Sequence, residues 1–495
     1  MKITKSAING ILYRGICGGV CAALTLAALA GCGNGSSSRN LMNEVSAGRE
    51  SAGGSSAETD GGSVSSAQTG GSQADGDSAY SGGGGQTDGG STIEGAQAGD
   101  GRAYADSSAS ADGGSAARRL PSADAVTYTD FAVRLFQECT RSRTEGNVLV
   151  SPLSVINALA MTANGARGET LEQMEELLGA DLNSLCSYLS SYNRSLPAGE
   201  KQKLHSADSI WIKEDKSFTA SPDFLQANAE WFGADVYMAP FDASTLKDIN
   251  RWVSENTDEM IPEILDEIPA DAVMYLVNAL AFDAEWQSVY KEYQIREGTF
   301  TLEDGTVQDA EMMYSTEYTW LQDTQAQGFV KYYYDTGYAF AALLPDEGVS
   351  LADYTASLTG ERLHELLSDT ASPSPSVEAA IPKFKSEYSV SLNDILENLG
   401  MTDAFDSDRA DLSGLGSSPD GTLYISRVLH KTFIALDEKG TRAGAATAVE
   451  IVKESAAINP LESKTVYLDR PFVYMIIDCE ENLPVFMGTV TELEQ

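Results

Sequence analysis

Apolar and polar residues divide the chain of 495 residues into three stretches. A short apolar run covers residues 16–30, residues 33–119 contain almost no large apolar side chain, and apolar runs recur from about residue 120 onward. Only the last stretch can bury enough apolar surface to form a hydrophobic core. The pattern therefore places one large domain at residues 120–495.

Within this domain, apolar residues follow helical periodicity in some segments and strand periodicity in others, which predicts both helices and strands. We expect helices at 128–137, 152–164, 169–178, 218–232 and 392–400. We expect strands at 148–150, 208–212, 234–238, 274–282, 332–344, 377–384 and 423–436. The last of these is apolar enough to predict burial on both faces.

Three polar residues lie inside these apolar elements. Ser151 followed by Pro152 has the pattern of a helix N-cap and first turn, which accounts for both residues and leaves Ser154 unexplained. Asn278 interrupts an apolar strand, so its side chain requires hydrogen-bond partners. His430 lies in the middle of another strand and is interpreted as a core histidine rather than as a ligand or a base.

A run of small and β-branched residues follows the strand at 423–436. Gly440 frees the backbone, and residues 441–449 are poorly suited to a helix. At strand period one face would carry Thr441, Ala443, Ala445 and Thr447, and the other Arg442, Ala446 and Glu450. This sorting favours a segment that is a loop at one time and a half-buried strand at another. The alternative is a surface loop sorted by chance.

The first 31 residues have the pattern of a signal peptide. Lys2, Lys5 and Arg14 precede the apolar run, which ends in Leu29-Ala-Gly-Cys32. This ending resembles the bacterial lipobox, which implies cleavage and diacylation of Cys32. The chain would then be exported and anchored by lipid at the bacterial cell surface, facing outward. A plain secretory signal is the alternative.

Residues 32–119 are rich in Gly, Ser, Ala and Asp. Because such a composition cannot offset the loss of chain entropy on folding, we expect a disordered tether. Its end-to-end distance would be about 50 Å. It would space the domain from a membrane.

Charge, cysteines and motifs exclude several functions. A net charge of −40 argues against nucleic acid as a partner. Cys139, Cys186 and Cys479 are too scattered to form a disulfide framework. We find no paired-histidine or Cys-x-x-Cys metal spacing, no nucleophile elbow and no phosphate-binding loop, so no metal, cofactor or enzymatic activity is predicted.

Several ordered motifs resemble the serpin family. They are Asp437-Glu-Lys-Gly-Thr441 with the alanine-rich run after it, Val466–Ile476, Leu483–Gly488, and Asn147-Val-x-x-Ser-Pro-x-Ser154. The resemblance covers roughly residues 126–490. It implies the α+β serpin fold, with three β-sheets, packed helices, and an exposed reactive-centre loop from Glu438 to about Lys464. Residues 249–264 resemble the serpin helix that packs across the main sheet.

The resemblance also assigns site residues. The hinge of the loop would comprise Glu438, Gly440, Thr441, Ala443, Ala445, Ala446 and Thr447. A hydrogen-bonded "shutter" beneath the main sheet would comprise Ser151, Ser154, Asn278 and His430. Trp286 would mark the "breach" where the hinge enters. The attacked bond would be Glu454–Ser455, with Lys453, Ala456 and Ala457 as alternatives. Asp283-Ala284 replaces the Lys-Gly that is usual in the family, which leaves the local turn open.

The implied function is suicide inhibition of serine proteases, with cysteine proteases as a second target class. The partner would be the target protease in a covalent complex with a monomeric inhibitor. A non-inhibitory serpin that acts as a binding module is the first alternative, although its expected bulky or charged residues are absent from the inserting face of the hinge. An unrelated surface hydrolase is the second, and turnover of a substrate would identify it.

Overall fold

The computed structural model describes residues 38–42, 122–143, 145–214, 218–270, 272–368, 374–417, 423–441 and 463–494. The predicted signal peptide, Cys32, most of the predicted tether and residues 442–462 of the predicted loop lie outside these residues. No helix in the part that is described is long and apolar enough to cross a membrane.

The main sheet has seven strands and carries the candidate site. Its strands, in spatial order, are β1 (Arg39–Asn40), β5 (Asp235–Ala239), β3 (Gln202–Lys213), β6 (Met274–Glu285), β16 (Gly440–Thr441), β15 (Arg427–Leu436) and β13 (Phe384–Ser391). Strand β6 is buried along almost its whole length, as its unbroken apolar sequence predicts.

The described residues also form two further sheets and one short strand pair. The six-stranded sheet has the order β2 (Val148–Val150), β19 (Leu483–Val490), β18 (Phe472–Asp478), β11 (Tyr338–Pro345), β10 (Ala326–Tyr332) and β9 (Thr319–Gln322). The four-stranded sheet has the order β17 (Lys464–Tyr467), β12 (Val377–Pro382), β8 (Val307–Glu317) and β7 (Ile295–Thr301). Strands β14 (Gly416–Ser417) and β4 (Thr219–Ala220) form the additional pair.

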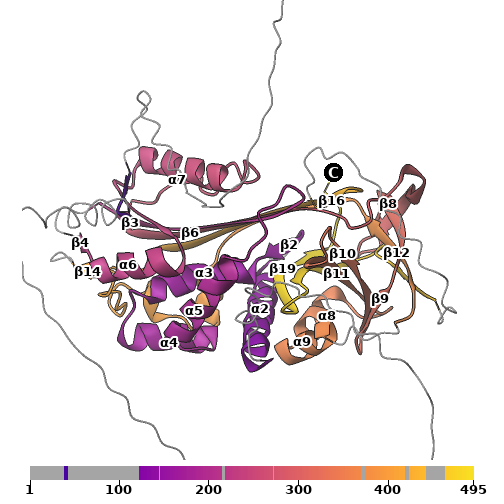
Figure 1. Ribbon diagram of the computed structural model, residues 1–495, viewed down its shortest axis with the longest axis horizontal. Helices are drawn as coiled ribbons and strands as arrows, with labels where there is room; N and C mark the ends of the chain where they lie inside the picture. The colour runs from indigo at the N-terminus through magenta and orange to yellow at the C-terminus, as the bar shows by residue number, and fades with distance from the viewer. Residues whose placement is uncertain are drawn as a thin grey trace, which may run out of the picture. The chain divides into compact units, whose positions relative to one another are not determined.

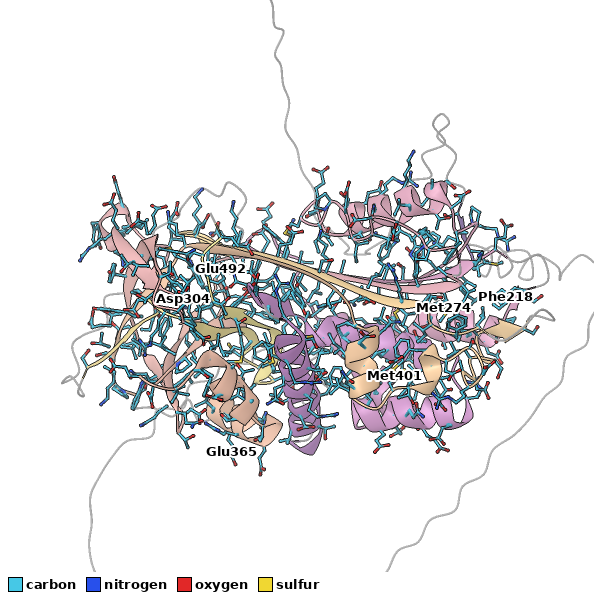
Figure 2. All side chains as sticks on the ribbon, turned by 180° about the vertical axis from the view of Figure 1, so that it is seen from behind. Phe218, Met274, Asp304, Glu365, Met401 and Glu492 are labelled. Carbon is cyan, nitrogen blue, oxygen red and sulfur yellow. The ribbon has the colours of Figure 1, made fainter. Side chains whose placement is uncertain are left out.

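Helices cover both faces of the main sheet (Figure 1). Helix α7 (Ala243–Asn256) lies on one face, and its outward side chains project away from the sheet (Figure 2). The opposite face is covered by α3 (Pro152–Ala163), α4 (Gly168–Leu178), α5 (Leu182–Asn193) and α6 (Pro222–Trp231). The other helical segments are α2 (Ser122–Ser142), α8 (Leu351–Ser357), α9 (Gly360–Ser368), α10 (Asn393–Asn398), η1 (Glu292–Gln294) and η2 (Asp403–Phe405).

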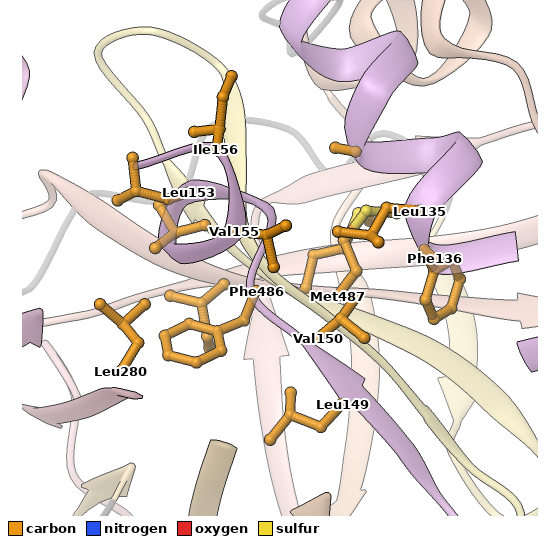
Figure 3. Packing of buried hydrophobic residues seen from close by; sticks show 14 of the residues in the cluster. Leu135, Phe136, Leu149, Val150, Leu153, Val155, Ile156, Leu280, Phe486 and Met487 are labelled. Atoms are coloured by element: carbon orange, nitrogen blue, oxygen red, sulfur yellow. The ribbon is translucent and has the colours of Figure 1, made fainter. Parts of the chain in front are cut away.

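The core lies where α3 passes beneath the main sheet. Every residue of α3 is buried. Its side chains Leu153 and Val155 lie among Phe486 of β19 and Leu280 of β6 (Figure 3). A helix that is buried on all sides is typical of the core of a large protein. It fixes the position of its N-terminal serines beneath the middle of the sheet.

Several predicted boundaries are wrong. Helix α2 is longer than 128–137, and α7 spans Ala243–Asn256 rather than 249–264. The latter is shifted because Asp242 caps its start by accepting from Ser244 N, whereas Asp258 and Glu259 adopt positive φ angles of 48° and 59° beyond its end.

The predicted helix at 218–232 is also shorter, because Ser221 caps α6 and the two residues before it form β4. Strand β15 begins at Arg427 rather than at residue 423. It is not buried on both faces: Lys431, Phe433 and Ala435 are half-buried on the side that α7 covers only in part.

Candidate functional site: the hinge and the seam of the main sheet

The centre of the main sheet contains a boundary that a further strand could enter. Strands β6 and β15 pair directly and in parallel, from Tyr275↔Arg427 to Ala281↔Phe433. We call this boundary the seam. At its end, β16 lies between the two strands, with Gly440 opposite Glu285 and Thr441 opposite Ala284 (Figure 1). The first strand residues of the hinge are therefore already in the sheet, and the seam beyond them is closed.

This arrangement corrects the expected start of the exposed loop. Gly440 and Thr441 are buried rather than exposed. The need for glycine is steric, because a Cβ atom at Gly440 would lie 1.9 Å from the carbonyl oxygen of Ala284. The turn left open by Asp283-Ala284 is also resolved, since β6 continues through both residues to Glu285.

Thr441 lies on the core side of the sheet. It is fully buried, and its hydroxyl lies 2.5 Å from the hydroxyl of Tyr333. At strand period, Ala443, Ala445 and Thr447 share the face of Thr441. These three residues and Ala446 lie outside the described residues.

Trp286 supports the turn that leads into β16. Its indole Nε1 donates to the carbonyl oxygen of Asp437 at 2.9 Å, and its backbone N–H donates to that of Lys439 at 2.8 Å. The indole ring is stacked on Tyr333, with ring centroids 4.5 Å apart and planes 7° apart. The Nζ atom of buried Lys331 lies 5.4 Å from the same indole ring and pairs with Glu317 at 2.9 Å. The hinge therefore enters against a rigid aromatic surface.

An ion pair holds the outer side of the same turn. The Nζ atom of Lys383 lies 2.9 Å from Oε2 of Glu438, and both side chains are only partly exposed. The hydrogen bond from Lys383 lowers the pKa of Glu438. Asp437 closes the turn by accepting from the backbone N–H of Lys439 at 2.7 Å.

Beneath the middle of the seam, a buried polar network joins α3 to β6 and β15. Ser154 Oγ donates to Asn278 Oδ1, and Asn278 Nδ2 donates to the carbonyl oxygen of Ser154. The Nδ1 atom of His430 lies 2.9 Å from Asn278 Oδ1. All three side chains are buried. The partners that the buried Asn278 requires are thus present.

The hydrogen bonds around His430 define its tautomer. Its Nε2 accepts from the backbone N–H of Ser151 at 3.2 Å, so Nδ1 carries the proton and donates to Asn278. Burial lowers the pKa of His430 to about 3. The ring is therefore neutral at physiological pH, which favours a structural role over acid–base chemistry.

Ser151 does more than cap α3. Its Oγ accepts from Ser154 N, as a cap does, and also donates to the carbonyl oxygen of Val485 at 2.8 Å. Its backbone N–H donates to His430. Capping alone therefore does not explain Ser151, because its contacts also connect α3 to β19 and β15.

Sequence reasoning missed three residues of this site. Asp208 accepts from Asn278 Nδ2. It is the first residue of the strand expected at 208–212, so it did not stand out as a polar residue inside a strand, whereas the observed β3 extends from Gln202 to Lys213. Tyr333 and Lys383 carry no local signal, because their contacts with the hinge come from other sheets or distant strands.

The remaining predicted site residues lie outside the described part of the chain. The proposed scissile region, Lys453 to Ala457, lies outside the described residues, as does Cys32. Among the described residues, no group of three or more His, Cys, Asp and Glu side chains could hold a metal ion. What the geometry permits is a mechanical step, in which the seam opens and accepts the strand that begins at β16.

Comparisons with known proteins agree with this geometry. The family model described as "Serpin (serine protease inhibitor)" matches residues 126–493. The leukocyte elastase inhibitor of Equus caballus is 33% identical over 364 residues, which cover 70% of this chain and 93% of that protein. Serpin B9 of Homo sapiens is 30% identical over 372 residues, which cover 72% and 96%.

The chain is also similar to solved serpin structures. Tengpin, a thermophilic serpin, in its native state matches with a TM-score of 0.71 and 47% identity, covering 76% of this chain and 95% of that one. The latent state of tengpin matches with a TM-score of 0.66 and 45% identity, covering 76% and 99%. From its fold, its hinge and these relatives, the chain belongs to the serpin family of serine protease inhibitors.

Proposed function

We propose that this protein inhibits serine proteases as a suicide substrate. The observation that carries the proposal is the position of Gly440 and Thr441, which lie between β6 and β15 at the open end of an otherwise closed seam. A hinge in this position is poised to continue along the seam once the loop beyond it is cut.

The covalent step uses the chemistry of the protease. Its serine Oγ attacks the carbonyl carbon of a loop peptide bond, and the amine of the following residue leaves with a proton, so that an ester joins the two proteins. The freed hinge then extends β16 along the seam. New backbone hydrogen bonds at ~1 kcal/mol each over roughly a dozen residues supply on the order of 10 kcal/mol. The attached protease is displaced and distorted before water can cleave the ester.

We place the attacked bond at Glu454–Ser455, from the spacing that follows the hinge glutamate in the family. Lys453 would suit a trypsin-like enzyme, and Ala456 or Ala457 would suit an elastase-like one. The names of the leukocyte elastase inhibitors among the relatives support the elastase-like alternative. Cysteine proteases remain a second target class, because they form a comparable thioester.

We further propose that the protein acts as a monomer outside the cell. The apolar run and Leu29-Ala-Gly-Cys32 support export followed by lipid attachment to Cys32 at a bacterial membrane. Metabolic labelling with a radioactive fatty acid would test the anchor. A Cys32→Ser variant should lose the label and leave the membrane fraction, and equal labelling of both forms would contradict it.

The central test is a covalent complex. The purified protein is mixed with trypsin-like, elastase-like and glutamate-specific proteases, and the products are separated in SDS. At least one protease should form an adduct of summed mass, and mass spectrometry of the released C-terminal fragment should place the cut between Ile451 and Asn459. If every protease that cuts the loop leaves a clipped protein and stays active, inhibition is refuted.

A pair of substitutions tests insertion separately from cleavage. Ala445→Glu puts a carboxylate on the face that Thr441 turns toward the core, where it would lack a partner. Insertion should slow, and the moles of inhibitor consumed per mole of protease should rise at least severalfold while the cut site stays the same. Ala446→Glu, on the opposite face, is the matched control and should be much milder. Equal effects would contradict the two-face interpretation of the hinge.

A further inference from the structure

The outer edge of the main sheet is occupied by a short segment from near the N-terminus. Residues 38–42, which we call the docked segment, contain β1, and β1 pairs antiparallel with β5 in the register Arg39↔Met238 and Asn40↔Tyr237. For these residues the structure differs from the expectation of a disordered tether. Their sequence is polar apart from Leu41 and Met42, so local patterning could not reveal the pairing.

The docked segment makes specific apolar and hydrogen-bonding contacts with β5. Leu41 is only 3% exposed and belongs to the same core cluster as Val236 and Met238. Its backbone N–H donates to the carbonyl oxygen of Val236 at 2.8 Å. Asn40 Nδ2 donates to Asp235 Oδ1 at 2.7 Å. The segment therefore combines strand addition, one apolar anchor and a side-chain hydrogen bond.

A second carboxylate ties the docked segment to α7. Both the backbone N–H and the Oγ of Ser38 donate to Oδ2 of Asp248, at 3.2 and 2.7 Å. Asp248 lies on α7 and is only 5% exposed. Because Asp235 lies on β5 and Asp248 on α7, one short segment joins the edge strand to the helix that covers the sheet.

Helix α7 and the segment that follows it together cover the seam. Ile249 and Val253 of α7 belong to a cluster that also contains Ile264 and Leu265 of the following segment, Val277 of β6 and Leu429 of β15. Ile264 and Leu265 line one hollow together with Leu429 and His430, so the following segment is the part that reaches β15. When the seam opens, β6, β3 and β5 move together away from β15. They must then slide beneath α7 and the segment after it, because that segment also lies against β15. A contact that fastens α7 to β5 resists this sliding.

The docked segment acts at the end of the seam that lies far from the hinge. Tyr237, opposite Asn40, is in register with Trp211 and through it with Tyr275, where direct pairing of β6 and β15 begins. The hinge is in register with Ala284 and Glu285. These two levels are separated by roughly 30 Å along β6, at about 3.3 Å per residue.

We propose that the edge formed by β5 and α7 is a peptide-binding site for the docked segment, and that its occupation holds the far end of the seam closed until the reactive loop is cut. The inference rests on the proposed function, because it concerns the same insertion step. The occupant is Ser38–Met42 of the same chain. The connection to α2 is roughly 80 residues, and at ~3.3 Å per residue it can join any two points on the domain.

The test uses the full-length protein and a Leu41→Asp variant, in which a carboxylate replaces the buried leucine beside Asp235 and Asp248. Arg39→Lys is the matched control, since Arg39 is exposed and the charge is kept. Hydrogen exchange of backbone amides is followed along β6 and β15. In Leu41→Asp, exchange near Tyr275 and Arg427 should accelerate at least tenfold, and by more than it does near Ala281. Arg39→Lys should match the unsubstituted protein.

A synthetic peptide of residues 37–43 should restore slow exchange in Leu41→Asp, whereas a scrambled peptide should not. Unchanged exchange at the far end of the seam in Leu41→Asp would overturn the proposal, as would failure of the peptide to rescue. A dimer that dissociates when excess peptide is added would overturn the same-chain assignment. Exchange needs no protease, so its result is separate from that of the complex assay. If no protease is trapped but exchange behaves as expected, the proposed function fails and the peptide site stands.

Discussion

The breach and the shutter lie along the same seam and are held in different ways. At the breach, the hinge turn is fastened by a partly exposed ion pair, Lys383 with Glu438, and by hydrogen bonds from Trp286 to backbone carbonyls. At the shutter, Ser154, Asn278 and His430 form a buried network without a formal charge on any of the three. One end of the seam is thus weakly held and the middle strongly held.

The difference matches what each region must do. A strand enters at the breach, so contacts there should yield at modest cost, and solvent-screened ion pairs contribute little to stability. The shutter has to stay closed until the strand arrives. Buried hydrogen bonds suit that role, because breaking them before new partners are available leaves desolvated groups unpaired. Three predictions sharpen the contrast.

The largest effect is expected for His430→Ala. The change removes the acceptor for Ser151 N–H and the donor to Asn278 Oδ1, and it leaves a cavity. We expect the free energy of unfolding to fall by about 3 kcal/mol, measured by denaturant unfolding. His364→Ala is the control, because His364 is half-buried on α9, away from the seam, and should cost less than about 1 kcal/mol. A similar loss of unfolding free energy in both variants would show that the hydrogen-bond network of the shutter adds no particular stability.

An intermediate effect is expected from acidification. Burial lowers the pKa of His430 from 6.5 to about 3, so between these values the unfolded chain binds a proton that the native protein excludes. Stability should therefore fall as pH drops below about 6.5, by up to ~1.4 kcal/mol per unit, or roughly 2 kcal/mol at pH 5.

The same titration separates the two regions. The pKa of Glu438 is lowered in the native protein from 4.5, so its contribution is present above about pH 4.5 and is lost only as pH falls further. His430→Gln should remove most of the slope between pH 6.5 and 5, whereas Glu438→Gln should leave it unchanged. Denaturant midpoints measured at several pH values provide the comparison, and an unaltered slope in His430→Gln would contradict the assignment.

The smallest effect is expected for Glu438→Lys. It replaces an attraction with a repulsion from Lys383, but both side chains reach solvent, so the global loss should be no more than about 1 kcal/mol. The local effect should be greater, with faster hydrogen exchange at the amides of Gly440 and Thr441. The exchanged pair, Glu438→Lys with Lys383→Glu, should recover slow exchange. If it does not, the ion pair is not what holds the hinge turn.

The local sequence pattern predicts several of the helices and strands. The helix start at Ser151 and Pro152 follows from capping chemistry, and β6 follows from an unbroken apolar run. The ends of α7 differ from the expected 249–264, because Asp242 caps its start and positive φ angles at Asp258 and Glu259 follow its end. The hinge composition indicated a strand-forming segment from Thr441 onward, but not that Gly440 and Thr441 are already in the sheet.

By itself, the sequence determined the type and approximate position of elements such as α3 and β6, because these depend on capping and on apolar pattern over a few neighbouring residues. Only the tertiary structure decided which residues far apart in the sequence come into contact. Glu438 pairs with Lys383, and Leu41 packs against β5, each across more than 50 residues. The family resemblance implied that Asn278 meets Ser154 and His430, but no local pattern in the sequence did. Such partners follow from the register of distant strands, and register is set by the packing of the whole core rather than by any local signal.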